Sequence, residues 1–367
     1  MGWETGISWT WHRRGVAANR TELDLLLLEA GVPLAALEAA GSQADLQWLL
    51  TRPKYGFVWQ DGVVYQRGGS GNVIDGCSKV GEHEMSGCLG CYAAISDENK
   101  GRVAVPGWHA KDAAQNIKLR PRMLDELLAW QRRLEKVDQT RRVFLDSMSD
   151  LGHTQIDSLD PDYRQRTLEV ISRCDRIEAW IFTKRPGTLA AVKGYPKNVV
   201  LGTSVASWLD LRRLHTLARV SQANPDIPLV ASLEPAVGPM GTLPWLELPQ
   251  YRMAIFGGES GSHIRPLRLE WAEDVRRQTL AAQAQTGIAL FEKQTSAHPN
   301  EVRLLLGGCY YWQWPGELYP AIQASAETAA RTARLQHLLS DDDLRAMISR
   351  YPDMPELAYH WSEAAAL

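Results

Sequence analysis

From about residue 141 onward, short apolar runs alternate with amphipathic stretches. The runs are "RRVFLDSMSD", "AWIFTKRP", "NVVLGTSV", "PLVASLEP", "YRMAIFGGES" and "IALFEKQ". Continuous apolar runs separated by helical patterns such as "RLEWAEDVRRQTLAAQAQTG" are typical of parallel strands that helices bury on both faces. Six such strands, and a further one leading into residue 76, predict an α/β fold, a partial or complete parallel β/α barrel of the TIM type. A doubly wound open sheet is the rival architecture.

Two regions do not follow this alternation. Residues 11–70 contain "TELDLLLLEAGVPLAALEAAGSQADLQWLL", which predicts two or three short helices, and "KYGFVWQDGVVYQR", which predicts a hairpin around its Asp-Gly turn. Residues 317–367 are Ala-rich and predict a C-terminal helical extension. We therefore expect residues 1–10 to be an N-terminal segment of the core, 11–70 an inserted small helical and hairpin module, and 71–316 a β/α core that carries the remaining strands.

The composition is that of an ordinary globular protein, with 45% hydrophobic and 23% charged residues. The net charge of -3 gives no general attraction for nucleic acid, so such binding would need a local basic patch. No apolar run approaches the ~20 residues of a membrane span, and the start "MGWETGISWTWHRRG" lacks the apolar centre of a signal peptide. We expect a cytoplasmic protein with no membrane partner.

Polar side chains follow the predicted strands at the point where each strand ends. In parallel α/β folds this edge carries the active site. The residues are Ser147, Ser149, Asp150, Lys184, Arg185, Ser204, Glu234, Glu259 and Lys293. Any single one could be a helix cap or a surface charge, but their recurrence at the strand ends indicates a functional site.

Three of the five cysteines lie in the segment "GCSKVGEHEMSGCLGCYA", residues 76–93, called the cysteine loop below. The Cys-x-x-Cys step from Cys88 to Cys91 lets two thiolates face one metal centre, and Cys77 can join them across the glycine-bearing loop. The spacing alone leaves open a [4Fe–4S] cluster on three thiolates, a zinc site completed by His83, and cysteines that merely pack. The position of the loop before the parallel strands favours the cluster, because an open iron would face the polar strand ends.

Several motifs occur in a constant order along the chain. They are "ISWT", "GCSKV…SGCLGCYA", "RRVFLDSMSDLGH", "FTKRP", "NVVLGTSVAS", "SLEPAVGP", "GGESGSHIRP" and "FEKQ". This ordered set resembles a phage-associated three-cysteine protein family of unknown function, which is itself similar to radical S-adenosylmethionine (SAM) enzymes. Two departures from the family pattern are the insertion of residues 11–70 after "ISWT" and a first cysteine gap that is longer by the equivalent of "GEHEM".

The resemblance implies a radical SAM-like enzyme. Cys77, Cys88 and Cys91 would bind three irons of a [4Fe–4S] cluster, and SAM would chelate the fourth. One electron, supplied by a small donor of the flavodoxin or ferredoxin type, would cleave SAM and release a 5′-deoxyadenosyl radical. The phage association implies a nucleobase, nucleotide or nucleic acid as the substrate of a modification or repair reaction.

Within such an enzyme, the charge of each strand-end side chain and its place along the chain indicate what it would bind. The assignments are Ser147, Ser149 and Asp150 for the SAM ammonium, Lys184 or Arg185 for its carboxylate, Ser204 and Glu234 for ribose hydroxyls, Gly257 and Gly258 for close approach of the backbone, and Arg265 and Lys293 for an anionic substrate group. The catalytic candidates are Glu234, Glu259 and Lys293. Two other interpretations stay open: a zinc-stabilised nucleic-acid-binding protein without redox chemistry, and a metal-free β/α hydrolase or transferase that uses the same three catalytic candidates.

Overall fold

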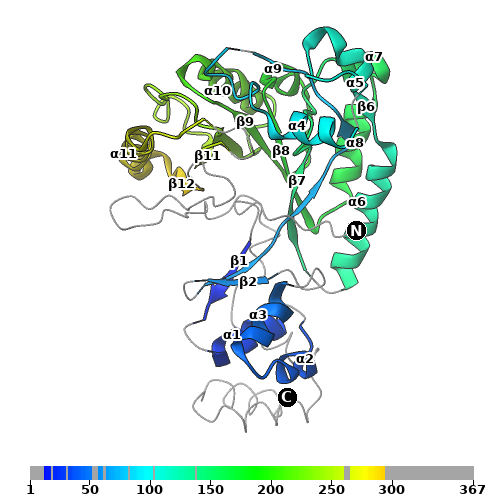
Figure 1. Cartoon of the computed structure of the whole chain (residues 1–367), viewed down its shortest axis with the longest axis vertical. Coiled ribbons are helices and arrows are strands. Elements are labelled where there is room, and N and C mark those ends of the chain that lie inside the picture. Colours follow the sequence, from blue (N-terminus) through cyan, green and yellow to red (C-terminus); the bar gives the residue numbers. More distant parts are fainter. Residues whose placement is uncertain are drawn as a thin grey trace.

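The structure is a computed structural model of the 367-residue chain. It describes residues 12–17, 20–29, 32–51, 57–60, 63–81, 83–101, 104–136, 139–259 and 265–293. The predicted N-terminal segment 1–10 and the predicted extension 317–367 lie outside the described residues, as does the end of the predicted core after residue 293. Figure 1 shows a large α/β part and, at one end of it, a smaller part formed by the N-terminal elements.

The large part is built on a seven-stranded sheet. In spatial order its strands are β12 (Ala289–Glu292), β11 (Tyr251–Phe256), β10 (Leu229–Leu233), β9 (Val199–Ser204), β8 (Ile177–Thr183), β7 (Arg141–Leu145) and β4 (Gly69–Gly71). Every neighbouring pair is parallel. The spatial order follows the chain order and does not show the reversal that defines a doubly wound sheet. The fold is therefore mixed α/β, and its described strands form an open parallel sheet.

Helices connect successive strands of this sheet (Figure 1). They are α6 (Pro121–Lys136), α7 (Gln155–Leu159), α8 (Tyr163–Ser172), α9 (Pro186–Ala190), η3 (Trp208–Asp210), α10 (Arg212–Ala218), η4 (Arg219–Gln222) and α11 (Leu269–Thr286). Local sequence sets two of their ends: α9 begins at Pro186, which suits a first helical position, and α11 ends at Thr286, followed by the capping residue Gly287 with φ of 70°. Because right-handed crossovers in a constant strand order place helices on one face, these elements cover one side of the sheet.

Strands β7 to β12 contribute side chains to two separate cores, because successive residues point to opposite faces. The core beneath the helices includes Val143, Ile181, Leu201, Ala231 and Leu290. The core on the opposite face consists of Trp180, Phe182, Val200, Val230, Met253, Ile255, Ala289 and Phe291, with Phe144 packed against it. Burial of both faces explains why the strands read as continuous apolar runs rather than as alternating patterns.

The cysteine loop follows β5 (Ile74–Asp75), which pairs antiparallel with β6 (Lys118–Leu119). Between these two short strands lie the loop itself, α4 (Tyr92–Asn99), η2 (Ala110–Asp112) and α5 (Ala113–Asn116). Helix α4 begins directly after Cys91. The short β5–β6 ladder therefore fixes both ends of the segment that carries the three cysteines.

The N-terminal module comprises β1 (His12–Val16), α1 (Arg20–Glu29), α2 (Leu34–Ala39), α3 (Gln43–Thr51), β2 (Phe57–Gln60) and β3 (Val63–Gln66). Its three strands form an antiparallel sheet in the order β1-β3-β2. The module has a core of its own, in which Leu23, Leu27, Leu46 and Phe57 are buried. Three helices and the β2–β3 hairpin agree with the sequence pattern, whereas strand β1 was not predicted.

Among the described helices, none is both long enough and apolar enough to cross a membrane.

Candidate functional site

A cavity of about 470 Å³ lies at the C-terminal edge of the parallel sheet, against the cysteine loop. This volume is in the range of small-molecule sites, roughly 300–1,000 Å³. With one exception, every cofactor-binding, catalytic and metal-binding residue predicted from the sequence lines it: Cys77, Cys88, Cys91, Ser147, Ser149, Asp150, Lys184, Arg185, Ser204, Glu234, Gly258, Glu259 and Lys293. The exception is Gly257, which is buried and whose carbonyl accepts a hydrogen bond from the Ala236 amide at 2.9 Å.

The strand alternation explains why these residues meet. Lys184, Glu234 and Lys293 continue, just past the strand ends, the register of the face that carries Phe182 and Phe291. The floor of the cavity is aromatic, because the rings of Phe144 and Phe182 pack edge to face with their centroids 5.5 Å apart. The cavity therefore combines an apolar floor with polar side chains at its rim.

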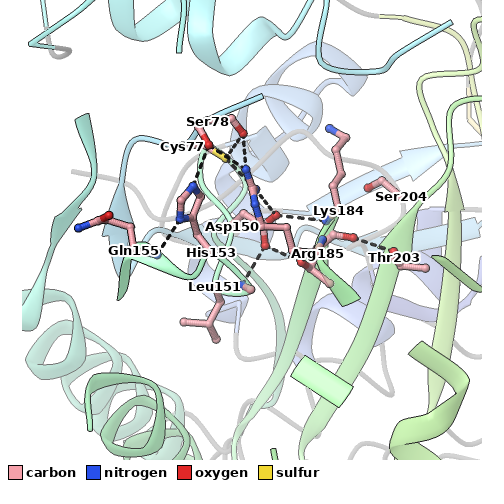
Figure 2. Close-up of polar contacts among 12 residues, drawn as sticks. Cys77, Ser78, Asp150, Leu151, His153, Gln155, Lys184, Arg185, Thr203 and Ser204 are labelled. Atoms are coloured by element: carbon pink, nitrogen blue, oxygen red, sulfur yellow. Dashed lines mark hydrogen bonds and ion pairs between the residues drawn. The ribbon is translucent and has the colours of Figure 1, made fainter. Parts of the chain in front are cut away.

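On the side of β7 and β8, Asp150 and Arg185 form a buried ion pair in which Arg185 Nη1 lies 2.9 Å from Asp150 Oδ2 (Figure 2). The same guanidinium donates from Nη2 to the Ser78 carbonyl at 2.5 Å and to Ser78 Oγ at 3.0 Å, and its Nη1 lies 3.5 Å from Cys77 Sγ. Thr183 Oγ1 donates to Asp150 Oδ1 at 2.6 Å. Asp150 and Arg185 thus connect the end of β8 to the first cysteine.

His153 belongs to the same hydrogen-bonded group. Its Nε2 lies 2.8 Å from Ser78 Oγ, and its Nδ1 accepts from the Gln155 amide at 3.0 Å. Burial and the neighbouring Arg185 charge lower the pKa of His153 to about 4, so the ring is neutral at physiological pH. A neutral ring that accepts at Nδ1 can donate from Nε2 to Ser78, which stabilises the loop at the residue after Cys77.

The three thiols differ in their electrostatic surroundings. Burial, together with the Asp150 charge, raises the pKa of Cys77 to about 12. Burial also acts to raise the pKa of Cys88, but the Lys184 charge and hydrogen bonds from backbone amides in the loop outweigh it, so this pKa lies below its ordinary value. Burial acts to lower the pKa of Lys184, and the three thiols together raise it above its usual range. Lys184 is therefore close enough to all three cysteines to interact with them electrostatically.

The arrangement of these thiols bears on which metal they could hold. The described residues contain no group of three or more His, Cys, Asp or Glu side chains placed to bind a metal ion. A single zinc ion needs every thiolate sulfur about 2.3 Å from one point. In an iron–sulfur cluster each thiolate instead ligates a different iron, so the sulfurs stand around a larger centre. His83, the fourth ligand of the zinc interpretation, does not line the cavity.

On the side of β10 to β12, two further ion pairs lie at the strand ends. Lys293 Nζ is 3.2 Å from Glu234 Oε1, and both side chains line the cavity. Arg265 contacts Glu259 with two donors, Nε at 2.9 Å and Nη2 at 2.5 Å. Its remaining donor group, Nη1, donates to the carbonyls of Glu84 and Ser86 in the cysteine loop. Arg265 therefore fastens the loop to the segment after β11, and it does not line the cavity as an anion-binding residue would.

Asp146 is a cavity-lining residue that the strand-end prediction missed. Its Oδ1 accepts from the amides of Val73 and Ile74 and from Ser149 Oγ, whereas Oδ2 is buried without a hydrogen-bond partner among the described residues. Burial raises the pKa of Asp146 to about 7. Its φ of 59° is uncommon for a residue other than glycine. Strained backbone of this kind concentrates at functional sites, but it leaves no signal in the sequence.

Residues 68–337 match the model of a family described as "Protein of unknown function (DUF5131)". The chain belongs to this family. The match begins just before β4 and includes the cysteine loop and all seven strands of the parallel sheet, while the N-terminal module precedes it. The comparisons with curated proteins and with solved structures gave no match.

Proposed function

We propose that this member of the family is a radical SAM-like enzyme that binds a [4Fe–4S] cluster through Cys77, Cys88 and Cys91. The observation that carries the proposal is that the three cysteines line the same cavity as the polar strand ends of a parallel sheet. The ordered motifs described above, which resemble those of a phage-associated family similar to radical SAM enzymes, support it. We infer further that the open parallel sheet is part of a partial or complete β/α barrel.

A set of three thiolates suits an iron–sulfur cluster. Thiolates are the usual ligands of such clusters, and the three thiols line one cavity. The Lys184 ammonium lies near all three sulfurs, and Arg185 lies beside Cys77. Such positive charge stabilises a thiolate-ligated centre that carries net negative charge.

When bound, the cluster and SAM supply reductive cleavage of a carbon–sulfur bond and abstraction of a hydrogen atom from the substrate. The chain itself has three tasks. Asp150 and Arg185 fix the loop at Cys77, and the Arg265–Glu259 pair fixes it from the opposite side. Ser147 and Ser149, which line the cavity, would bind the ammonium group of SAM, and Lys184, which also lines it, would pair with the SAM carboxylate.

The polar groups of the cavity that have no role in holding the loop or SAM are available to bind the substrate. The Glu234–Lys293 pair lies on the side of the cavity formed by β10 and β12, and it offers one acceptor and one donor next to each other. The aromatic floor of Phe144 and Phe182 suits a flat ring. We propose a nucleobase, nucleotide or nucleic acid as the substrate class, and a small flavodoxin-type or ferredoxin-type protein as the electron donor.

The test is anaerobic purification followed by metal analysis. We expect a brown protein with about four irons per chain, as one [4Fe–4S] cluster requires, and we expect Cys88→Ala to lose that iron. Cys174→Ala is the matched control, because Cys174 is a buried thiol that does not line the cavity. Formation of 5′-deoxyadenosine from SAM under reduction then tests the reaction.

Each competing interpretation gives a different result in the same preparation. A colourless protein with one zinc per chain that His83→Ala releases would support the zinc interpretation. Activity that is indifferent to chelators and to Cys88→Ala would support a metal-free hydrolase or transferase. The position of His83 outside the cavity does not favour the zinc alternative.

A further inference from the structure

A second hollow, of about 350 Å³, lies on the outer side of the cysteine loop. Its walls come from the loop, from the segment that follows β8, and from η3 and the start of α10. It shares Val80 and Lys184 with the main cavity, so the two spaces are separated by little more than these residues. Of the residues that line this hollow, the proposed reaction uses Lys184 alone.

Three cationic side chains line the hollow, against one carboxylate. The carboxylate, Asp210, already has partners: Oδ1 lies 2.8 Å from Arg213 Nη2, and Oδ2 accepts from the Ala206 amide at 3.1 Å. Arg213 also donates from Nη1 to the Ser204 carbonyl at 2.9 Å. Arg213 is therefore fixed in orientation, and its charge is balanced by Asp210.

The other two cations are not balanced in this way. Within the described part of the chain, neither the Lys184 ammonium nor the Arg212 guanidinium makes a hydrogen bond or an ion pair. Figure 2 shows the Lys184 side chain extending away from the Asp150–Arg185 pair, with no contact drawn to its nitrogen. Lys184 also interacts with the three thiols of the main cavity, so its charge is shared between the two spaces, and together with Arg212 it raises the local concentration of anions in the hollow.

We propose that this second hollow binds the phosphate group of an organic phosphate, with Lys184, Arg212 and Arg213 as its cationic contacts. A phosphate carries several acceptor oxygens, which suit one ammonium and two guanidinium groups. Val80 and Leu209, which are 41% and 37% exposed, give the same hollow an apolar margin for the organic part of such a ligand. A free inorganic anion would not need that margin.

Binding here has a consequence for the neighbouring cavity. Val80 and Gly81 line the hollow, and their backbone amides face the Cys88 sulfur. An anion held between the loop and α10 therefore restrains the segment that supports Cys88. The site also lies beside Lys184, so a ligand in the hollow and one in the main cavity contact opposite sides of the same residue.

Calorimetric titration of the full-length protein with pyrophosphate tests the proposal, because binding is measured without iron or reduction. The result is thus independent of the proposed enzymatic function. We expect saturable binding, and we expect Arg212→Gln to weaken it by about tenfold, the loss of one charge-assisted hydrogen bond. Arg122→Gln is the control, because Arg122 is an exposed arginine on α6, outside the hollow.

Two results would overturn the site: the absence of saturable binding to the wild-type protein, or equal weakening by Arg212→Gln and Arg122→Gln, which would indicate nonspecific attraction.

A competition experiment identifies the part of the ligand that binds. Adenosine 5′-monophosphate should displace pyrophosphate and adenosine should not. Displacement of pyrophosphate by adenosine, which carries no phosphate, would contradict a phosphate site.

Discussion

The two sides of the main cavity use their polar residues differently. On the side of β7 and β8, Asp150 and Arg185 are buried in hydrogen bonds that lead to the cysteine loop. On the side of β10 and β12, Glu234 and Lys293 make one ion pair with each other and remain at the cavity surface. The Asp150–Arg185 pair therefore supports the loop, whereas the Glu234–Lys293 pair keeps polar groups available to a ligand.

This contrast predicts that substitutions on the two sides have different effects, with those on one side lowering the stability of the fold and those on the other lowering substrate turnover. Variants on the β7–β8 side should reduce the free energy of unfolding and disturb the cysteine loop. Variants of the Glu234–Lys293 pair on the β10–β12 side should leave the fold and the loop intact. The predictions below are ordered by the expected loss in free energy of unfolding.

Arg185→Met should give the largest loss. It leaves the Asp150 carboxylate, which is 6% exposed, without its counter-charge, and removes the donors to Ser78. Breaking a buried ion pair in this way costs about 3 kcal/mol or more. Urea unfolding monitored by circular dichroism measures the loss.

The matched control for this variant is the double change Arg185→Met with Asp150→Asn. Because it removes the stranded charge as well, it should lose less than the sum of the two single variants. A loss of about 0.5 kcal/mol for Arg185→Met, as expected of an exposed pair, would remove the support role from this side of the cavity.

Asp146→Asn should change how stability depends on pH. Burial raises the pKa of Asp146 to about 7, so the folded state holds a proton that the unfolded state releases near pH 4. Its stabilising contribution is complete below the unfolded pKa and is lost as the pH rises through the folded value. The unfolding free energy of the wild type, relative to that of the variant, should therefore fall between about pH 4 and pH 7.

Comparison of the two proteins is essential here, because His153 has the opposite dependence. Its pKa is lowered to about 4, so its contribution is lost as the pH falls below the ordinary value near 6.5. The difference between wild type and Asp146→Asn cancels this effect. A difference that stays constant across the pH range would show that Asp146 is ionised in the folded protein throughout.

The strand ends could be predicted from the sequence, but the supports of the loop could not. Parallel strands bring their C-terminal ends to one edge, so the apolar runs were enough to gather Lys184, Glu234 and Lys293. The contact of Arg185 with Ser78 joins residues far apart in sequence, and no local pattern signals it. The contacts of Arg265 with the loop are likewise not visible in the chain order, so the sequence alone indicates only a cation near the strand ends.

In the N-terminal module, the local sequence pattern likewise predicts some elements of secondary structure and misses one. Helical periodicity and a hairpin turn predicted α1 to α3 and the β2–β3 hairpin. Strand β1 carries the sequence "HRRGV", which lacks an apolar alternation, and it forms because the edge of β3 is available for pairing. Pairing partners decide the conformation of such short polar segments, so tertiary context overrides the local pattern.

Gly202→Ala tests the floor that separates the two sides. A Cβ at this position would lie 1.9 Å from Cε1 of the Phe182 ring, which lines the cavity. The ring must move, and such overpacking typically costs about 1–3 kcal/mol. We expect a corresponding loss in urea unfolding and weaker binding of any ligand that contacts the ring.

Gly187→Ala is the control for this change. An added Cβ there meets only Thr216 Cγ2, at 3.9 Å, so the substitution should be close to neutral. Equal destabilisation by the two variants would mean that backbone freedom of glycine, rather than contact with Phe182, is responsible.

Lys293→Gln should have the smallest effect on stability and a large effect on turnover. The ammonium is 22% exposed and its partner Glu234 is 13% exposed, so solvent screens the pair and its loss should cost about 1 kcal/mol or less. Because the pair faces the cavity rather than the loop, metal content should match that of the wild type. Substrate turnover should nevertheless fall, since the donor next to Glu234 is lost. If Lys293→Gln instead releases metal, the Glu234–Lys293 pair supports the cysteine loop as well, and its distinction from the Asp150–Arg185 pair fails.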